Sequence, residues 1–360
     1  GETTMKALVK TKLGPDCMRY MEMQEPRPAE DEIKVRVYAC GICGTDIHLM
    51  HDEYPSKPPI ITGHEFSGVV VETGKNVTDF QVGDRVVTLT AIETCEECEY
   101  CRQGLRMLCP ERKSVGSGIN GGFAEFVILP ARHAFHIPEG VSLRTAALCE
   151  PLACVVRGVC ERTSITAGDY VLVAGAGVMA QLTAQVVMAN GGNVIMTGLA
   201  SDEERFALAK SLGVFATVRV DEGDPLSRVL QLTGGMGVDK AFECSGAAAS
   251  ADFCLDALKK TGYYTQIAIP GKPIPFDMDK ALYKEITISN SYASERSSWL
   301  TALRLLEHRQ IHIDSMISDM LPLSEWQDGF ERTIAKREFK ILLTPNPVDH
   351  PDFLKAGGQA

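Results

Sequence analysis

The feature that most constrains the fold is a series of short apolar runs, separated by helical segments, that begins at residue 170. Residues 180–190 and 202–212 have helical character and follow the first two runs. The apolar runs lie at 170–174, 193–197, 218–220, 240–244, 264–268 and 287–290. Strands that alternate with helices predict a parallel sheet with right-handed crossovers. We therefore expect an α/β fold whose doubly wound domain covers residues 156–294.

The turn after the first of these strands has the pattern Gly-x-Gly-x-x-Ala. Gly175 permits a tight turn, Gly177 lets the backbone approach a pyrophosphate, and the small Ala180 lets the helix pack on the strand. Val178 and Met179 begin the helix, where free N–H groups and the helix dipole favour an anion. In a strand–turn–helix context the pattern predicts a dinucleotide site. The alternative is a tight turn that binds nothing.

The end of the second strand indicates which dinucleotide is used. An NAD site usually has an acidic residue there, which binds the adenine ribose, but this chain has Gly198. The missing carboxylate removes a charge that would repel a 2′-phosphate, and Ser201 and Arg205 could reach such a phosphate. Alternatively, Arg205 is only a solvated residue of the helix, and Asp202 takes over the ribose contact. The choice between NAD and NADP stays open, with a slight preference for NADP.

Four cysteines in one short loop form the most specific local pattern. Cys95, Cys98, Cys101 and Cys109 have the spacing Cys-x2-Cys-x2-Cys-x7-Cys. Four thiolates so close in sequence match a closed, tetrahedral structural zinc site, which we place in a lobe over residues 93–112. An iron–sulfur cluster is the other chemistry that four thiolates support.

A second group of potential ligands is dispersed along the chain. It consists of Cys43, the pair His64 and Glu65, and Glu150. A lone cysteine is usually a small buried hydrophobe, and Glu150 could be a carboxylate at a helix start. Taken singly, none of these residues predicts a metal.

The chain before residue 155 is β-rich, with frequent glycine and proline. Residues 33–37 alternate apolar and polar side chains as a half-buried strand does, and 66–72 and 85–89 also have strand character. After the α/β region come a helical segment at 299–308 and a strand at 340–343. We expect a catalytic domain over residues 5–155 and 295–345, followed by a tail, 346–360, that frays.

These motifs together resemble the zinc-dependent, medium-chain alcohol dehydrogenase family. The pattern Gly63-His64-Glu65-x2-Gly68-x5-Gly74-x2-Val77 is similar to that family's motif. It is accompanied, in the family's order, by Cys-Gly-Thr-Asp-x-His at 43–48, by the cysteine lobe and by the glycine turn. The resemblance spans residues 5–345. It implies a GroES-like catalytic domain beside a Rossmann domain, two zinc ions per chain and a nicotinamide dinucleotide.

The resemblance also implies the substrate class. Ethanol-type members use a cysteine as the third protein ligand of the catalytic zinc, whereas this chain has Glu150. The pair Glu150-Pro151 resembles the sorbitol, or polyol, dehydrogenase branch. Such an enzyme transfers a hydride between a secondary alcohol and NAD(P). Ser291-Tyr292 stands where that branch often has an Arg-Tyr pair, so the resemblance does not identify the polyol.

Residue roles follow from the resemblance alone. Cys43, His64 and Glu65 surround the catalytic zinc, and Glu150 binds it directly or through water. Glu65 could instead hold the geometry of the site without ligation. Thr45 takes the proton of the substrate hydroxyl, and His48 delivers it to solvent.

Other functions stay open at this point. Threonine, a simple alcohol, a sugar acid or a sugar phosphate are alternative substrates within the same family. A protein that has lost catalysis is a further alternative, but it would require broken ligands, and Cys43, His64 and Glu150 are all present.

Composition bounds the partners and the compartment. A net charge of −11 argues against nucleic acid and anionic membranes as partners. No apolar run reaches the roughly 18 residues that a membrane-spanning helix needs, and residues 1–10 lack the apolar region of a secretory signal. Twelve cysteines, four of them clustered, indicate a reducing, cytoplasmic environment. The family resemblance implies a homodimer or a homotetramer.

Overall fold

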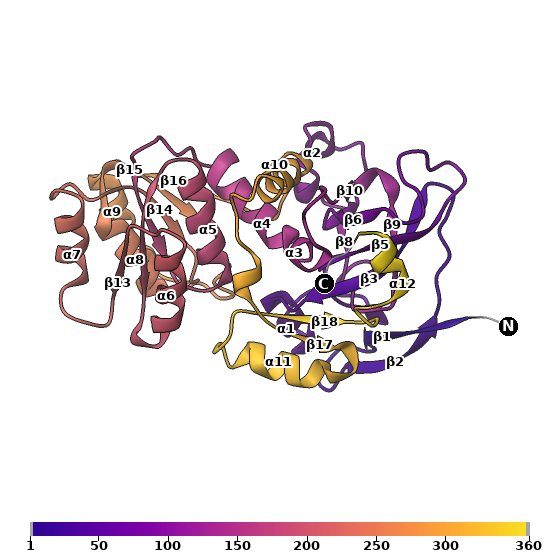
Figure 1. The fold of residues 1–360 in the computed structure, drawn as a ribbon. Coiled ribbons are helices and arrows are strands. Elements are labelled where there is room, and N and C mark those ends of the chain that lie inside the picture. The colour runs from indigo at the N-terminus through magenta and orange to yellow at the C-terminus, as the bar shows by residue number, and fades with distance from the viewer. Residues whose placement is uncertain (1–2, 358–360) are drawn as a thin grey trace. The chain divides into compact units, whose positions relative to one another are not determined.

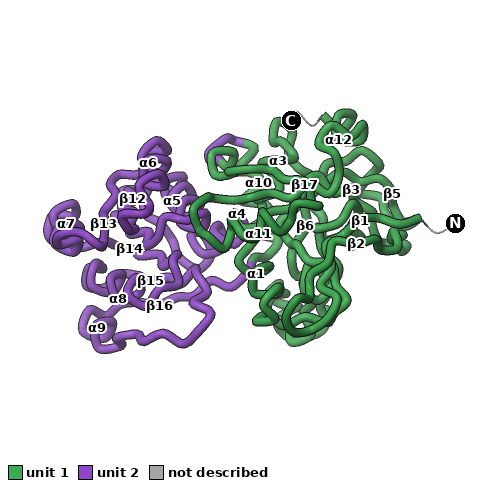
Figure 2. Tube along the Cα trace, turned by 90° about the horizontal axis from the view of Figure 1, so that it is seen from below, with its two compact units in different colours: residues 1–151, 294–307, 313–360 green, residues 152–293, 308–312 purple. Residues whose placement is uncertain are grey.

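The computed structural model describes residues 3–357 and divides into two compact units (Figure 2). Unit 1 contains the chain up to Pro151, then Ser294–Glu307, and the chain from Ile313 onward. Unit 2 contains Leu152–Ala293 and His308–His312. The chain therefore leaves unit 1 at Leu152, returns to it at Ser294, and enters unit 2 a second time for the short segment His308–His312.

Unit 2 is a six-stranded parallel sheet with helices between its strands (Figure 1). The spatial order of the strands is β13-β12-β11-β14-β15-β16. The order reverses between β11 and β14, because the chain first winds outward to β13 and then crosses to the other side of β11. The strands are β11 (Tyr170–Ala174), β12 (Asn193–Gly198), β13 (Ala216–Arg219), β14 (Val238–Glu243), β15 (Leu258–Gln266) and β16 (Thr287–Asn290).

Helices between the strands cover the sheet. A cluster of buried residues that includes Leu172, Ile195, Val229 and Leu255 joins the sheet to α7 and α8. The central strands are apolar on both faces, as strands between two helical layers must be. The helical elements of unit 2 are η3 (Arg157–Glu161, a π-helix), α5 (Val178–Ala189), η4 (Ala200–Asp202), α6 (Glu203–Ser211), α7 (Pro225–Leu232), α8 (Ala248–Ala257) and α9 (Met278–Tyr283).

Unit 1 is built on a seven-stranded sheet around β3. Its main path runs β10-β6-β5-β3-β18-β17, and β9 also pairs with β3. Smaller sheets have the orders β2-β1-β4 and β7-β8. The strands are β1 (Thr4–Lys10), β2 (Met18–Gln24), β3 (Glu32–Gly41), β4 (Ile60–Ile61), β5 (Glu65–Thr73), β6 (Arg85–Thr88), β7 (Ala91–Glu93), β8 (Lys113–Ser114), β9 (Phe126–Pro130), β10 (Ala134–His136), β17 (Ile317–Pro322) and β18 (Lys340–Thr344).

The helices of unit 1 are mostly short and connect these strands. α4 crosses the boundary between the two units, and α10 lies on the returning segment. The helical elements are α1 (Gly44–Met50), α2 (Glu99–Arg102), η1 (Arg106–Leu108), η2 (Ala131–His133), α3 (Leu143–Ala146), α4 (Cys149–Val156), α10 (Arg296–Glu307), η5 (Asp314–Met316), η6 (Leu323–Glu325), α11 (Trp326–Ile334) and α12 (Pro351–Lys355).

The predicted fold class, a doubly wound parallel sheet with a β-rich second domain, is confirmed. The expectation of a fraying tail does not hold for residues 346–357. There, α12 places Phe353 in the core of unit 1, edge-on to the ring of Tyr38 at 5.1 Å between ring centroids. Arg36 also pairs with Asp352 at 2.8 Å. The last three residues of the expected tail lie outside the described residues.

Across the described residues, the structure contains no helix that is both long enough and apolar enough to span a membrane.

Candidate active site and metal centres

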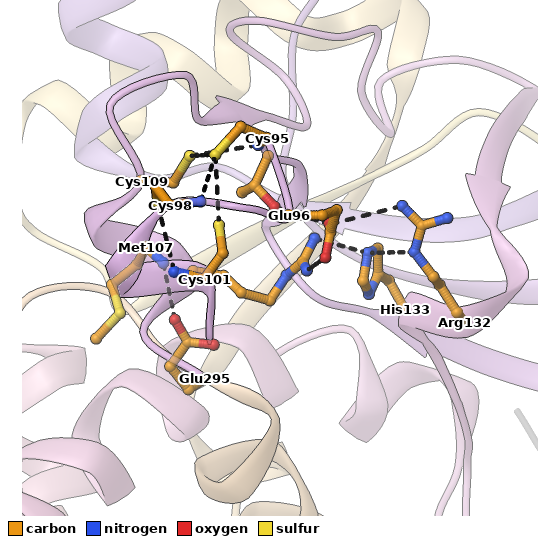
Figure 3. Close-up of polar contacts among 11 residues, drawn as sticks. Cys95, Glu96, Cys98, Cys101, Met107, Cys109, Arg132, His133 and Glu295 are labelled. Atoms are coloured by element: carbon orange, nitrogen blue, oxygen red, sulfur yellow. Dashed lines mark hydrogen bonds and ion pairs between the residues drawn. The ribbon is translucent and has the colours of Figure 1, made fainter. Parts of the chain in front are cut away.

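The four clustered cysteines converge in a small lobe of unit 1 (Figure 3). Their sulfur atoms all lie within 4.8 Å of one another, and Sγ of Cys109 lies 3.6 Å from Sγ of Cys95. Backbone N–H groups also point at the sulfurs: the N–H of Cys98 donates to Cys95, and that of Cys101 donates to Cys98. The backbone N–H groups of Glu97 and Cys98 lower the pKa of Cys95 to about 7, which favours the thiolate that a metal binds.

The cysteine lobe is held to the rest of unit 1 by polar contacts (Figure 3). The buried carboxylate of Glu295, just before α10, accepts a hydrogen bond of 2.7 Å from the N–H of Met107. Arg106 and Arg132 both point at Nε2 of His133, at 2.9 and 3.1 Å. Burial and these two cations lower the pKa of His133 to about 4, so the ring is neutral and accepts from them.

A second group of metal-binding side chains joins Cys43, His64 and Glu65. One ligand atom from each lies within 4.8 Å of the others. Thiolate, imidazole and carboxylate are the donors that zinc uses in catalytic sites, which keep a fourth position open for water or substrate. The donor set therefore fits zinc.

Pairing between β3 and β5 brings these residues together. Gly41 at the end of β3 pairs with Glu65 at the start of β5, so Cys43 and His64 flank that pair. The turn before β5 requires glycine, because Gly63 has a φ of +92° and a Cβ there would lie 2.8 Å from Sγ of Cys40. This explains why glycine precedes the histidine.

Charge surrounds His64. Its Nδ1 lies 3.8 Å from the fully buried carboxylate of Asp46, whose other oxygen accepts from the N–H of Cys43. Burial opposes protonation of His64, but contacts with Cys43, Asp46 and Glu150 outweigh burial and raise its pKa well above the usual range. The site is thus rich in negative charge, as a site for a divalent cation must be. No role was predicted for Asp46, although it belongs to the Cys-Gly-Thr-Asp motif.

Glu65 has a partner that the sequence did not indicate. The ammonium of Lys340, at the start of β18, lies 2.8 Å from Oε2 of Glu65 and 3.1 Å from Oε1. It also donates to the carbonyl of Ile42 at 3.1 Å, and it is almost fully buried. A charged residue that opens an otherwise apolar last strand is the one signal that could have revealed it.

Glu150 lies near the cluster but not within it. It is 9% exposed in the first turn of α4, and Thr90 donates to its Oε1 at 3.1 Å. Its negative charge contributes to the raised pKa of His64, which places it within electrostatic reach. The neighbouring Cys149 is fully buried, and burial raises the pKa of its thiol far from the range of a reactive thiolate.

The predicted proton carriers lie on α1, whose N-cap is Cys43. The hydroxyl of Thr45 is 3.9 Å from Sγ of Cys43. His48 follows one turn later, is half exposed, and has its Nδ1 2.8 Å from Oε2 of Glu53. Thr45 therefore faces the cluster, while His48 faces solvent.

In unit 2, the glycine turn between β11 and α5 has the shape that a pyrophosphate requires. Gly175 has a φ of +119°, and a Cβ at Gly177 would meet open space. No described side chain caps α5, so the N–H groups around Val178 and Met179 are available to an anion.

The carboxylate of Asp202 lies beside Gly198, which has no side chain of its own. A Cβ at Gly198 would lie 2.8 Å from Oδ2 of Asp202, which accepts a hydrogen bond from the N–H of Leu199. Arg205 pairs with the other oxygen of Asp202 at 3.1 Å. Ser201 is exposed beside them.

Comparisons with known proteins agree with this geometry. Residues 29–139 match the alcohol dehydrogenase GroES-like domain, and residues 178–308 match the zinc-binding dehydrogenase family. A sorbitol dehydrogenase of Halalkalibacterium halodurans is 39% identical over 95% of this chain and 99% of its own. A D-arabitol-phosphate dehydrogenase of Enterococcus avium is 35% identical over 96% and 99%.

Solved structures show the same fold over the whole chain. A Sinorhizobium meliloti protein assigned as a zinc-binding dehydrogenase, bound to NADP, is 33% identical with a TM-score of 0.89, over 96% of this chain and 100% of its own. The 2R,3R-butanediol dehydrogenase of Bacillus subtilis is 27% identical with a TM-score of 0.86, over 95% and 100%. With its cysteine lobe, its Cys-His-Glu group and its glycine turn, the chain belongs to the zinc-containing, NAD(P)-dependent alcohol dehydrogenase family.

Proposed function

We propose that this dehydrogenase oxidises a secondary hydroxyl of a polyol. The observation that carries the proposal is Glu150, a carboxylate beside the group of Cys43, His64 and Glu65, at the position where ethanol-type enzymes have a cysteine. The sorbitol dehydrogenase that is 39% identical supports the same substrate class. Threonine is the second candidate, since an L-threonine 3-dehydrogenase of Bacillus velezensis is 31% identical over 95% of this chain.

We assign the catalytic zinc to Cys43, His64 and Glu65, whose ligand atoms lie within 4.8 Å of one another. Glu150, hydrogen-bonded to Thr90 outside that group, would then bind through water. Lys340 competes with the metal for Glu65, because the same carboxylate already forms an ion pair with its ammonium. The second zinc is assigned to Cys95, Cys98, Cys101 and Cys109.

A zinc ion held by Cys43, His64 and Glu65 would lower the pKa of the substrate hydroxyl, and a bound nicotinamide dinucleotide would supply the hydride acceptor. Side chains of this protein transfer the proton of the hydroxyl group. Thr45 would take the hydroxyl proton at Oγ1 as it gives up its own, and His48 would release a proton to solvent, with Oε2 of Glu53 at 2.8 Å from Nδ1 of its ring. In this arrangement Nε2 of His48 is the atom that exchanges the proton.

For the cofactor we favour NADP. Gly198 leaves the end of β12 without a carboxylate of its own, and the relative from Sinorhizobium meliloti was solved with NADP. Arg205 lies near that position, although its pairing with Asp202 partly neutralises it. Discrimination between the two dinucleotides should therefore be modest.

We further propose a homo-oligomer in the cytoplasm. β16 is an edge strand of the unit 2 sheet, and Ile288 on it is exposed, as are Leu282 and Tyr283 on the preceding helix. An edge strand with exposed hydrophobic side chains on it and on the helix before it favours association with a second copy. All twelve cysteines are free, which fits a reducing compartment.

The test is the absorbance of reduced cofactor across a panel of sugar alcohols, polyol phosphates, threonine and simple alcohols, with NAD and NADP in parallel. Turnover of a free polyol at least about tenfold above the others in kcat/KM is expected. Preference for threonine or for a phosphorylated polyol would keep the chemistry and overturn the proposed substrate.

A further inference from the structure

Glu243 is a fully buried carboxylate that the zinc sites and the proton path do not use. It is the last residue of β14, the strand beside β11 at the centre of the unit 2 sheet. In register it pairs with Ala174, the last residue of β11, and with Gln266, the last residue of β15. Its side chain therefore lies at the carboxyl edge of the parallel sheet.

Every hydrogen bond to this carboxylate comes from a neutral donor. Oε1 accepts from the N–H of Ser245 at 2.9 Å and from its hydroxyl at 2.6 Å. Oε2 accepts from the N–H of Gly246 and from Nε2 of Gln266, both at 2.9 Å. Such a set of donors is what an ionised carboxylate, an acceptor at both oxygens, takes up.

The negative charge of Glu243 has no counterion. Among the described residues, no lysine, arginine or histidine forms a hydrogen bond or an ion pair with it. Lys240 and Lys259, on β14 and β15, pair instead with Asp169 and Asp239. Burial, with a smaller effect of the Glu243 charge, raises the pKa of the adjacent Cys244 to about 12. A buried charge without a counterion is costly and calls for an explanation.

The position of Glu243 in the sheet offers an explanation for this buried charge. The strand order of the sheet reverses between β11 and β14, and dinucleotides bind across the carboxyl edge at such a point. The loop that Glu243 holds lies against the glycine turn, because a Cβ at Gly175 would be 3.4 Å from the backbone nitrogen of Ser245. Since the adenine ribose binds at the end of β12, on one side of β11, the nicotinamide half falls to the β14 side.

The two redox forms of the nicotinamide differ in charge. The oxidised ring is a cation and the reduced ring is neutral, whereas the phosphates are the same in both. We propose that Glu243 is a fixed negative charge that favours binding of the oxidised dinucleotide over the reduced one. The proposal rests on the dinucleotide cofactor of the family and is independent of the polyol substrate.

A purely structural role for Glu243 predicts something different. If the carboxylate only tied down the loop at 245–246, its loss would weaken both redox forms by the same factor. Repulsion between Glu243 and the phosphates also affects both forms equally. The ratio of the two dissociation constants therefore isolates the effect on ring charge.

The experiment measures dissociation constants for NAD⁺, NADH, NADP⁺ and NADPH on the full-length, zinc-loaded protein without alcohol. Calorimetry serves for the oxidised forms and cofactor fluorescence for the reduced forms. In Glu243→Gln, the ratio of the oxidised to the reduced constant should rise roughly tenfold, as expected for loss of one charge near a partly solvated ring. Gln266→Lys, which places a cation against Glu243, should shift the ratio in the same direction.

Two variants serve as matched controls. Ser245→Ala removes a donor but keeps the charge, and Gln266→Met removes the Gln266 bond without adding a cation. Both should leave the ratio within about twofold of the parent protein, even if both affinities change. An unchanged ratio in Glu243→Gln and Gln266→Lys would overturn the proposal, as would an equal change in all four variants. If Glu243→Gln does not fold, Gln266→Lys decides alone, and the absence of polyol turnover leaves the ratio unaffected.

Discussion

The two cysteine-containing clusters of unit 1 are assembled in opposite ways. The lobe cluster takes all four sulfurs from one loop, Cys95 to Cys109, and backbone N–H groups of that loop stabilise them. The dispersed cluster takes Cys43 from the N-cap of α1 and His64 and Glu65 from the entry to β5. The first depends on local backbone geometry and the second on the pairing of β3 with β5. Loss of a ligand should therefore have different consequences in each.

The largest effect is expected when the dispersed cluster loses its thiolate. Cys43→Ala should lower kcat/KM by roughly a thousandfold or more, because the hydroxyl then lacks a Lewis acid worth several kcal/mol. The chain should stay folded, since Cys43 is only partly buried. Steady-state kinetics and circular dichroism measure both.

The matched control is Cys17→Ala. Cys17 is a buried thiol of unit 1 outside both clusters, and it donates a hydrogen bond to the carbonyl of Met50. Its loss should leave turnover within a few fold of the parent enzyme. Comparable turnover in Cys43→Ala and Cys17→Ala would rule out the dispersed cluster as the catalytic site.

The next largest effect is expected when Glu65 of the dispersed cluster loses its ion pair with Lys340. Lys340→Met leaves the buried carboxylate of Glu65 without its cation, which should lower the free energy of unfolding by about 3 kcal/mol. Urea unfolding of the zinc-free protein gives the value without a contribution from the metal. The double variant Glu65→Gln/Lys340→Met should recover part of the loss. A decrease in the free energy of unfolding of less than about 1 kcal/mol in Lys340→Met would show that the ion pair is not needed for stability.

A smaller effect is expected in the lobe. Cys98→Ser should remove the lobe zinc and lower the melting temperature by roughly 5 °C, because one loop loses its crosslink while the sheet of unit 1 remains. Turnover should persist at low temperature. If Cys98→Ser abolished turnover as completely as Cys43→Ala, the two clusters would not be independent.

The smallest effect is a dependence on pH beside the lobe. The pKa of His133 is about 4 in the folded protein against an ordinary value of 6.5. Below pH 6.5 the unfolded chain therefore binds a proton at His133 that the folded chain does not bind. The free energy of unfolding falls as the pH drops from 6.5 towards 4. Between pH 7 and pH 5 the melting temperature should fall by roughly 2–4 °C more in the parent than in His133→Gln, as calorimetry can measure. An identical pH dependence in both proteins would contradict this account.

What the sequence could predict follows the same division between local and distant contacts. The parallel sheet of unit 2, the glycine turn and the cysteine lobe all depend on residues near in sequence, and they were predicted. The pair of Glu65 with Lys340 joins residues 275 positions apart, and no periodicity indicates it. Phe353 and Tyr38, which pack together, are even further apart in sequence, so the last described helix was taken for a tail.

The direction in which each side chain points was the other feature that the sequence could not predict. Glu150 and Glu65 both follow from the family pattern, but only the fold shows that Glu65 joins Cys43 and His64 while Glu150 is bonded to Thr90. Similarly, Gly198 indicated a missing carboxylate, and only the turn after β12 shows that Asp202 folds back towards that position. A motif gives residue types, whereas the backbone decides which atoms meet.

The most direct test of the two-cluster account is the zinc content per chain of the parent protein, Cys43→Ala and Cys98→Ser, measured by mass spectrometry of the purified metal-loaded proteins. The account predicts two, one and one zinc ions, with the dispersed zinc lost in the first variant and the lobe zinc lost in the second. One zinc in the parent protein, retained in Cys43→Ala, would contradict the assignment of a catalytic zinc to Cys43, His64 and Glu65.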